Sequence, residues 1–284
     1  MADKPGGAGT NATGYLMILL LSLWPSLAQA ADLQPQTTAA FDRYAALTQA
    51  EFDAQLAGRE PFLWFESLPS DRRAKVEAQL RSGEVVVERL ETLDHGQPIA
   101  VPGGLIHHWI GTVFIPGATL AQTLNFERDY EHQQEFFRPD VERSKILRHD
   151  GDDFTIELVF FKKEVITSVV DTEHAVHYGS LDTTHAWSRS HTTRIQEVEN
   201  PGDANPRLAP EGHDRGFLWR MNTYWRFEEK DGGVYVESQS ISLTRAIPTG
   251  LGWLVERFVT SVPRESLTFT LAQTRRAILQ RIAK

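Results

Sequence analysis

The sequence changes from strands to a long amphipathic helix across one short corner, AIPTGLG (246–252). Pro248 cannot donate a hydrogen bond to a strand ladder, and Gly250 and Gly252 permit turn geometry that other residues resist. Beyond the corner, apolar residues recur at intervals of three and four and form one stripe. The stripe consists of Leu251, Leu254, Val255, Phe258, Val259 and Val262, and it resumes at Leu267, Leu271, Ile278 and Ile282. A single apolar stripe must be buried, so we expect the last helix to lie against a sheet.

The residues before this helix show the period of two that is typical of strands. Segments 84–91 and 105–116 come first, and apolar helical residues at about 118–137 follow, ending at Pro139. A hairpin over 143–163 turns at His149-Asp150-Gly151-Asp152, and β segments follow at about 166–178, 184–197, 217–229 and 234–245. The last two segments are joined by a predicted tight turn at Lys230-Asp231-Gly232-Gly233. Strands joined by tight turns form an antiparallel meander. The sequence therefore predicts an α+β protein with a curved antiparallel sheet of about seven strands wrapped round the C-terminal helix.

Residues 31–100 read as a helical N-terminal extension that carries a candidate extra strand at 85–92. Thr48 and Glu51 have the spacing of a capping box, which predicts a helix start at Thr48. A second helix begins at about Asp71 and stops at Gly83. Between them the apolar segment PFLWFESLP (61–69) is expected to dock on the main domain, with a lid over a pocket as the alternative.

Residues 1–30 resemble a secretory signal peptide. The apolar run GYLMILLLSLWPSLAQA ends in Ala28-Gln29-Ala30, the small-x-small pattern of a cleavage site. Pro25 interrupts the run, which is also short for a bilayer span. We expect cleavage after Ala30, secretion, in bacteria to the periplasm, and no stable transmembrane segment afterwards.

Net charge and cysteine content exclude several classes of function. The net charge of −9 argues against a general nucleic-acid binder, which needs a basic face. The chain has no cysteine, so disulfides, thiolate catalysis and thiolate metal sites are impossible.

Two stretches carry a resemblance to a known superfamily. Residues 129–163, DYEHQQEFFRPDVERSKILRHDGDDFTIELVFFKK, and residues 235–255, YVESQSISLTRAIPTGLGWLV, resemble the START-like or SRPBCC (helix-grip, Bet v 1-like) superfamily in the order of their elements. The resemblance implies a helix-grip domain over 101–284 with a deep apolar cavity between sheet and last helix. It implies no catalytic residue, because the superfamily has no universal catalytic motif.

Alternation along the strands identifies the residues expected to line that cavity. In 217–229 one face holds Trp219, Met221, Trp225 and Phe227; in the last strand Glu237 and Gln239 share a face. If that face points inward, Arg189 or Arg220 could pair with Glu237, but we expect Glu237 to face solvent. The predicted lining is Trp219, Met221, Trp225, Phe227, Glu237, Gln239, Leu254, Phe258, Leu267 and Leu271.

These observations favour non-catalytic binding, and potentially transport, of a hydrophobic small molecule or lipid, without cofactor, metal or nucleic acid. His174 and His177 are three apart, so on a strand they point to opposite faces and cannot share an ion. Two alternatives stay open: a cyclase- or hydrolase-like enzyme that uses Glu237, His191 or Arg220, and an interaction domain whose interior is filled by its own side chains. The sequence does not set the oligomeric state or the ligand.

Overall fold

The computed structural model describes residues 31–163, 167–203, 205–246 and 252–283; the side chains of Ala31 and of residues 252–260 are outside that description. The predicted signal peptide (1–30) and most of the predicted corner (247–251) lie outside the described residues. In chain order the main elements are α2 (Pro35–Leu56), η1 (Trp64–Ser67), α3 (Ser70–Arg81), β2 (Val86–Arg89), β5 (Gly104–Pro116), α4 (Leu120–Glu127), η2 (Tyr130–His132), α5 (Gln133–Phe137), β6 (Val141–Asp150), β7 (Asp153–Lys163), β8 (Thr167–Ser180), β9 (His185–Glu199), β12 (Arg220–Lys230), β13 (Gly233–Arg245) and α6 (Gly252–Ile282). The two-residue strands are β1 (Ala31–Asp32), β3 (Leu93–Asp94), β4 (Gln97–Pro98), β10 (Arg207–Leu208) and β11 (His213–Asp214).

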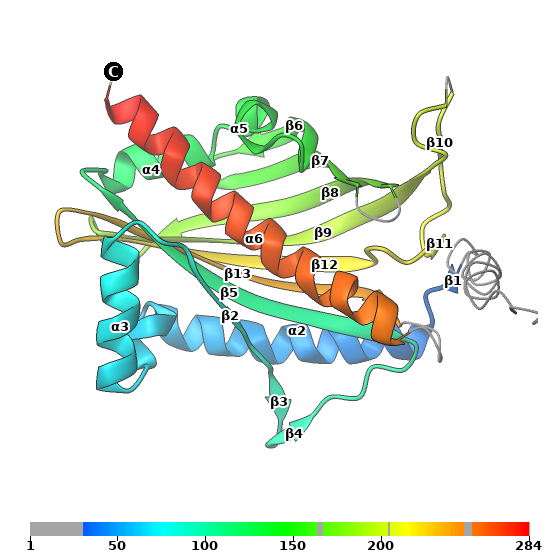
Figure 1. The fold of residues 1–284 in the computed structure, drawn as a ribbon, viewed down its shortest axis with the longest axis horizontal. Helices are drawn as coiled ribbons and strands as arrows, with labels where there is room; N and C mark the ends of the chain where they lie inside the picture. Colours follow the sequence, from blue (N-terminus) through cyan, green and yellow to red (C-terminus); the bar gives the residue numbers. More distant parts are fainter. Residues whose placement is uncertain (1–30, 164–166, 204, 247–251, 284) are drawn as a thin grey trace, which may run out of the picture.

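The main sheet is antiparallel and runs in the order β2-β5-β13-β12-β9-β8-β7-β6, with β10 paired to β9. The predicted meander is therefore confirmed from β6 to β13. The earlier strand β5 pairs with β13, the last strand of the chain (Figure 1). Both predicted tight turns are present, with Gly151 at φ 61° and with Asp231 and Gly232 at φ 58° and 77°. Positive φ at two successive residues is the geometry of a two-residue hairpin turn. This turn fixes the register of β12 against β13.

Helix α6 lies across one face of the sheet, as the apolar stripe predicts (Figure 1). Leu267 and Leu271 pack there against Val113 of β5, Val236 of β13 and Phe227 of β12 in one buried cluster. Burial of each such side chain stabilises the fold by about 1.5–3 kcal/mol. Pro263 lies inside a helix that is assigned continuously from Gly252 to Ile282, so the helix does not restart there.

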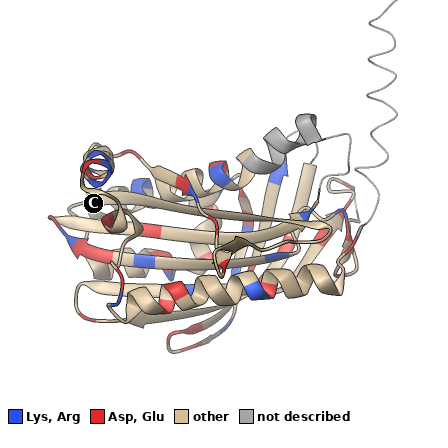
Figure 2. Ribbon diagram, turned by 90° about the horizontal axis from the view of Figure 1, so that it is seen from below, with Lys and Arg blue, Asp and Glu red and all other residues tan. Residues whose placement is uncertain are grey.

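The N-terminal extension covers the opposite face of the sheet. Phe41, Tyr44 and Phe52 of α2 form a buried cluster with Tyr224 of β12 and Ile241 of β13. A further cluster joins η1 and α3 to β5 and β13 through Leu63, Phe65, Val76, Leu80, Phe114 and Tyr235. In the edge view of Figure 2 the sheet is therefore seen between α2 and α6. The central strands have helices on both faces.

The extension contains the predicted extra strand but not the predicted helix start. The candidate extra strand is present as β2, at the sheet edge beside β5. The helix start at Thr48 is wrong, because α2 begins at Pro35 and Thr48 lies buried within it. The Thr48 hydroxyl instead makes a hydrogen bond of 2.8 Å with that of Thr92. The apolar segment that includes η1 is docked on the sheet.

Candidate functional site

The sheet face toward α6 is the candidate ligand-binding face. Its apolar side chains fall into two groups. Phe227, Leu267 and Leu271 are fully packed in the cluster described above. Trp225 is only partly buried, and its ring is parallel to that of Phe227 at a centroid distance of 6.1 Å. Met221 shares the face by alternation and is also half-buried.

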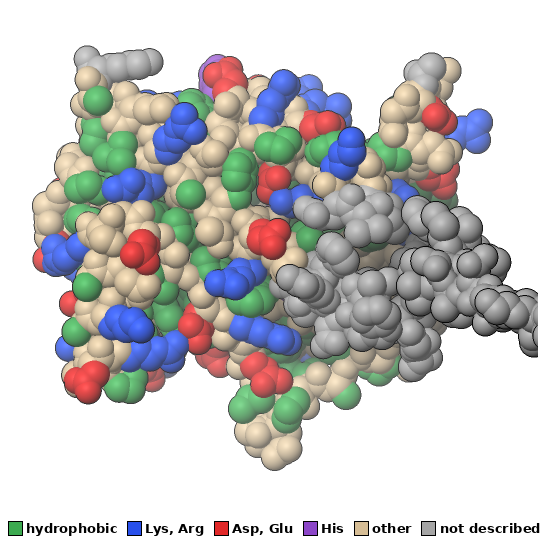
Figure 3. Space-filling view, in the orientation of Figure 1, with side chains coloured by type: hydrophobic (Ala, Val, Ile, Leu, Met, Phe, Trp, Pro, Cys, Tyr) green, Lys and Arg blue, Asp and Glu red, His purple; other side chains and the backbone are tan. Residues whose placement is uncertain are grey.

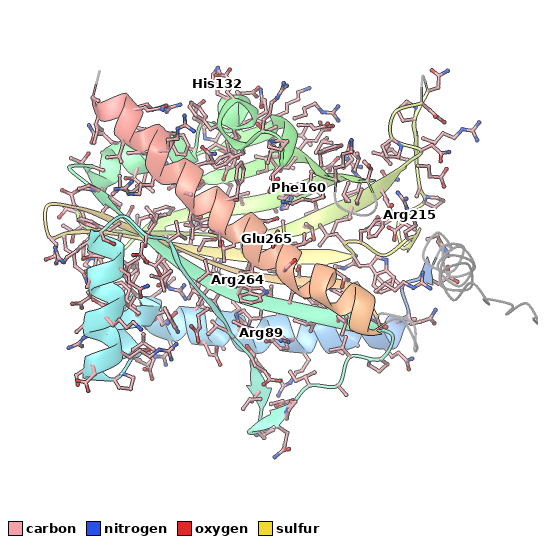
Figure 4. The ribbon with its side chains drawn as sticks, in the orientation of Figure 1. Arg89, His132, Phe160, Arg215, Arg264 and Glu265 are labelled. Carbon is pink, nitrogen blue, oxygen red and sulfur yellow. The ribbon has the colours of Figure 1, made fainter. Side chains whose placement is uncertain are left out.

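Half-buried apolar side chains extend this surface across several strands. Besides Trp225, they include Trp109 of β5, Leu158 and Phe160 of β7, and Phe269 of α6. Figure 4 shows Phe160 on the side of the sheet from which α6 is seen, while Arg264 and Glu265 belong to the exposed surface of α6. In the space-filling view, hydrophobic side chains reach this surface among charged ones (Figure 3). Partly exposed aromatic and aliphatic groups on one side of the sheet give a flexible apolar ligand contact area.

The titratable side chains deepest on this face are held in their neutral forms. Burial raises the pKa of Glu127, at the end of α4, to about 8. Burial lowers the pKa of His174 to about 3 and that of His107 to about 4. Each group is therefore uncharged at pH 7. Removal from water disfavours the charged form of both carboxyls and imidazoles.

Other polar side chains on this face are neutral and make hydrogen bonds with one another or with the backbone. Tyr130 and Tyr178 share a hydrogen bond of 2.7 Å between their hydroxyls, and the Tyr178 hydroxyl also donates to the backbone carbonyl of Glu127 at 3.3 Å. Burial raises the pKa of both tyrosines. His174 Nε2 lies 2.9 Å from the Thr172 hydroxyl. Within the described part of the chain, Glu127 Oε1 and Thr274 Oγ1 are buried without a hydrogen-bond partner.

Glu237 and Gln239 lie on the other face of the sheet, beneath α2 and η1, so they do not line the space under α6. The expectation that Glu237 faces solvent is wrong, since it is 0% exposed. Its partner is Arg226, which is 1% exposed and lies directly opposite in register, with Nη1 3.3 Å from Oε1; neither Arg189 nor Arg220 pairs with it. Trp219 also belongs to the α2 side, where it packs with Phe41 and Ile241.

Four hydrogen bonds from three groups satisfy the Glu237 carboxylate and connect it to the extension. The Trp64 backbone N–H donates to both carboxylate oxygens at 3.1 and 3.0 Å, and the Thr112 hydroxyl donates at 3.0 Å. Arg226 also donates to Gln55 of α2 and to Gln239, and its guanidinium lies 4.6 Å from the Phe52 ring centroid. Burial raises the pKa of Glu237 to about 7 against the opposing effect of Arg226.

The network continues from Gln239 to the far side of α2. The Gln239 amide donates to His108 Nε2 at 2.8 Å, and His108 Nδ1 lies 2.9 Å from the Tyr44 hydroxyl. Burial lowers the pKa of His108 to about 3, so its ring is neutral and can accept at one nitrogen and donate at the other. The Tyr44 hydroxyl accepts from the Thr92 backbone N–H at 2.7 Å. This chain of hydrogen bonds fixes the extension to the sheet.

The residues named for the enzyme alternative do not meet under α6. Glu237 is enclosed by η1, and His191 and Arg220 share its side of the sheet by alternation and register. Leu254 and Phe258 lie in α6 among residues whose side chains are outside the described set. His174 is buried on the α6 side, whereas His177 lies on the other face, 2.7 Å from Asp153. The described residues hold no group of three or more His, Cys, Asp or Glu able to bind a metal.

Sequence reasoning missed Glu127, although its position could have been noticed. It occupies a single acidic position at the end of an apolar helical segment, where Leu120, Thr123 and Phe126 are also buried. A carboxyl on the buried side of a short helix is expected to be neutral or paired. None of the helices in the described ranges has a window apolar and long enough to span a bilayer.

The element order, with a meander that ends in a helix laid across the sheet, is the arrangement of a helix-grip fold. No protein-family model matches the sequence, and no curated protein matches it. Solved structures that resemble it include a STAR-related lipid transfer protein from Xanthomonas axonopodis, with 16% identity and TM-score 0.42 over 66% of this chain and 98% of the other. Human STARD10 has 9% identity and TM-score 0.41 over 75% and 81% of the two chains, and the Zhui aromatase/cyclase from Streptomyces has 11% and 0.41 over 63% and 96%.

Proposed function

We propose that the protein binds a hydrophobic small molecule or lipid between α6 and the sheet and does not catalyse a reaction on it. The observation that carries this proposal is the set of half-buried apolar side chains on that face, among them Trp225, Phe160 and Phe269. A ligand that covers them gains about 25 cal/mol for each Å² of apolar surface removed from water.

The neutral state of the buried titratable groups supports an uncharged or weakly polar contact surface. Glu127, His174 and His107 would each repel an apolar ligand if ionised, because the ion would lose hydration without a partner. In their neutral forms they can donate or accept single hydrogen bonds. The preferred ligand is therefore mainly apolar, with at most a few hydroxyl or carbonyl groups.

The test is binding of the neutral fluorescent probe N-phenyl-1-naphthylamine to delipidated protein, together with native mass spectrometry of protein purified from its own host. Trp225→Ala is expected to weaken probe binding about ten-fold, which is about 1.4 kcal/mol of lost contact. Leu208→Ala is the matched control, because Leu208 is 47% exposed and lies on β10, away from α6. Absence of both saturable probe uptake and co-purifying ligand would contradict the proposal.

We also propose that residues 1–30 direct secretion and are removed after Ala30. The support is the sequence pattern, and the strand β1 begins at Ala31 and pairs with β11, so the fold holds the first residues after the proposed cut. Intact-mass measurement of protein recovered from the periplasm tests this. A mass that includes residues 1–30 would contradict cleavage.

A further inference from the structure

A concave site lies on the sheet face away from α6. It is a groove of about 470 Å³ whose floor is made by β7, β8, β9 and β12, with Gln49 of α2 on its border. This volume is in the range of about 300–1,000 Å³ found for small-molecule sites. Thr155 and Ala175 lie directly opposite each other in the floor of the groove, and their short side chains leave space above the sheet.

Four polar side chains form a compact patch in this groove. Arg189 of β9 is directly opposite Tyr224 of β12, and His191 is directly opposite Asn222. All four line the groove. Residues directly opposite on antiparallel strands have Cβ atoms about 4.5–5.5 Å apart, so one small ligand can contact all four.

The Tyr224 hydroxyl is a buried donor without a hydrogen-bond partner among the described residues. Tyr224 is 2% exposed, its ring packs on Phe52 at 5.0 Å, and its hydroxyl makes no hydrogen bond within the described residues. Burial raises the pKa of Tyr224, and nearby Asn222 opposes this rise without reaching hydrogen-bonding geometry with the hydroxyl. Leaving such a group unsatisfied costs about 1–3 kcal/mol, so a ligand acceptor at this point is favoured.

The arginines of the groove are also loosely paired. Arg189 approaches Asp53 only to 3.7 Å, and Arg148 approaches Asp150 only to 4.0 Å. By contrast, Arg194 of the same strand β9 holds Asp171 at 2.8 Å and Glu173 at 2.9 Å. The guanidinium groups in the groove therefore keep donors for another acceptor.

Two acidic side chains also line the groove, Asp153 and Asp150, and Asp150 approaches only Arg148 among the described residues. Asp153 lies 2.7 Å from His177 Nδ1, whereas the side chain of His191 makes no hydrogen bond to another described residue. The four-residue patch itself contains a guanidinium, a phenol, an imidazole and an amide, and no carboxylate. Guanidinium, phenol and imidazole N–H or O–H groups recognise carboxylate and phosphate oxygens.

We propose that this groove binds a small organic anion, whose carboxylate or phosphate oxygens accept hydrogen bonds from Arg189 and Tyr224. The site is separate from the surface under α6, because alternate residues of β9 and β12 face the two sides. It therefore does not depend on the proposed hydrophobic ligand.

The experiment titrates the mature chain with phenyl phosphate and with benzoate by isothermal calorimetry at 0.15 M salt. Saturable one-to-one binding of either probe is expected, and the probe that binds identifies phosphate or carboxylate as the preferred group. Arg189→Gln is expected to weaken binding at least ten-fold, and Tyr224→Phe, which keeps the ring packed on Phe52, about three-fold or more. Ala175→Leu, which fills the floor without removing a donor, is expected to abolish binding.

Arg72→Gln is the matched control, since Arg72 is 50% exposed, pairs with Glu88 and lies on α3 outside the groove. It is expected to bind both probes as the parent does. Failure of both probes to bind saturably, or equal weakening by Arg72→Gln and Arg189→Gln, would overturn the proposal. Circular dichroism and N-phenyl-1-naphthylamine binding of each variant separate loss of the groove from loss of the fold.

Discussion

Glu127→Gln is expected to make the protein more stable at neutral pH and to reduce the dependence of its stability on pH. Glu127 is 6% exposed, and its pKa is about 8 in the folded protein against 4.5 for an unperturbed carboxyl. Between these values the folded state keeps the proton and the unfolded chain releases it. The stabilising contribution of the protonated group is therefore complete below pH 4.5 and is lost as pH rises through 8.

The magnitude follows from the two pKa values. Each pH unit in this window removes about 1.4 kcal/mol of unfolding free energy, and the whole window corresponds to about 5 kcal/mol. Glutamine has the shape of a protonated glutamate but cannot ionise. The difference in unfolding free energy between Glu127→Gln and the parent should therefore grow in favour of the variant by about 1.4 kcal/mol per unit between pH 5 and pH 8.

Urea unfolding at several pH values measures this difference, with midpoint and slope fitted separately. Glu142→Gln is the control, because Glu142 is an exposed carboxyl on β6. Parallel stability curves for the parent and Glu127→Gln across pH 5 to 8 would refute the reasoning. They would mean that Glu127 is charged and compensated in the folded protein.

Three further changes test the opposite face of the sheet. Arg226→Met should reduce the free energy of unfolding, measured in urea at pH 8, by about 3–5 kcal/mol, because it leaves the Glu237 carboxyl buried without its ion partner. An effect no larger than that of Arg72→Met at the surface would contradict this prediction. Phe52→Ala should reduce it by about 3–5 kcal/mol and speed proteolysis within α2, since the ring is fully buried against Tyr224 and Trp187; unchanged proteolysis would show that α2 is held by other contacts. A fragment of residues 101–284 should show no cooperative thermal unfolding by circular dichroism, because removal of α2 exposes the apolar face of the sheet beneath it. A sharp transition would instead show that the helix-grip part folds alone.

The sheet and its covering helix could be predicted from sequence because each signal was local. Alternation marked the strands, Asp231 and Gly232 marked the last hairpin, and the stripe of α6 required a partner surface. The alternation also placed three of the four residues named for this stretch correctly, whereas Trp219, just before β12, packs on the α2 side. Met221, Trp225 and Phe227 are on the α6 side, as expected from their alternation.

The position of Glu237 could not be predicted in the same way, because alternation shows which residues share a face but not what covers it. Both faces of β13 are buried, so the Val234 side and the Tyr235 side are equally protected from solvent. One signal was nevertheless present. A turn centred on Asp231 and Gly232 sets Lys230 opposite Gly233 and therefore Arg226 opposite Glu237. The pairing of opposite charges across a hairpin indicates that both side chains are on the same face and can be buried together.

The sheet separates two kinds of chemistry, and neighbouring residues of one strand belong to different sides. Trp225 contributes to the neutral, apolar surface toward α6, whereas Arg226 contributes to the charged network that holds the extension. Because a strand turns successive side chains to opposite faces, a change at either position leaves the contacts of the other face in place. Ligand binding under α6 and attachment of α2 can therefore be altered independently through adjacent positions. This division requires that Trp225→Ala loses probe binding but keeps normal stability. It also requires that the folded fraction of Arg226→Met binds the probe normally.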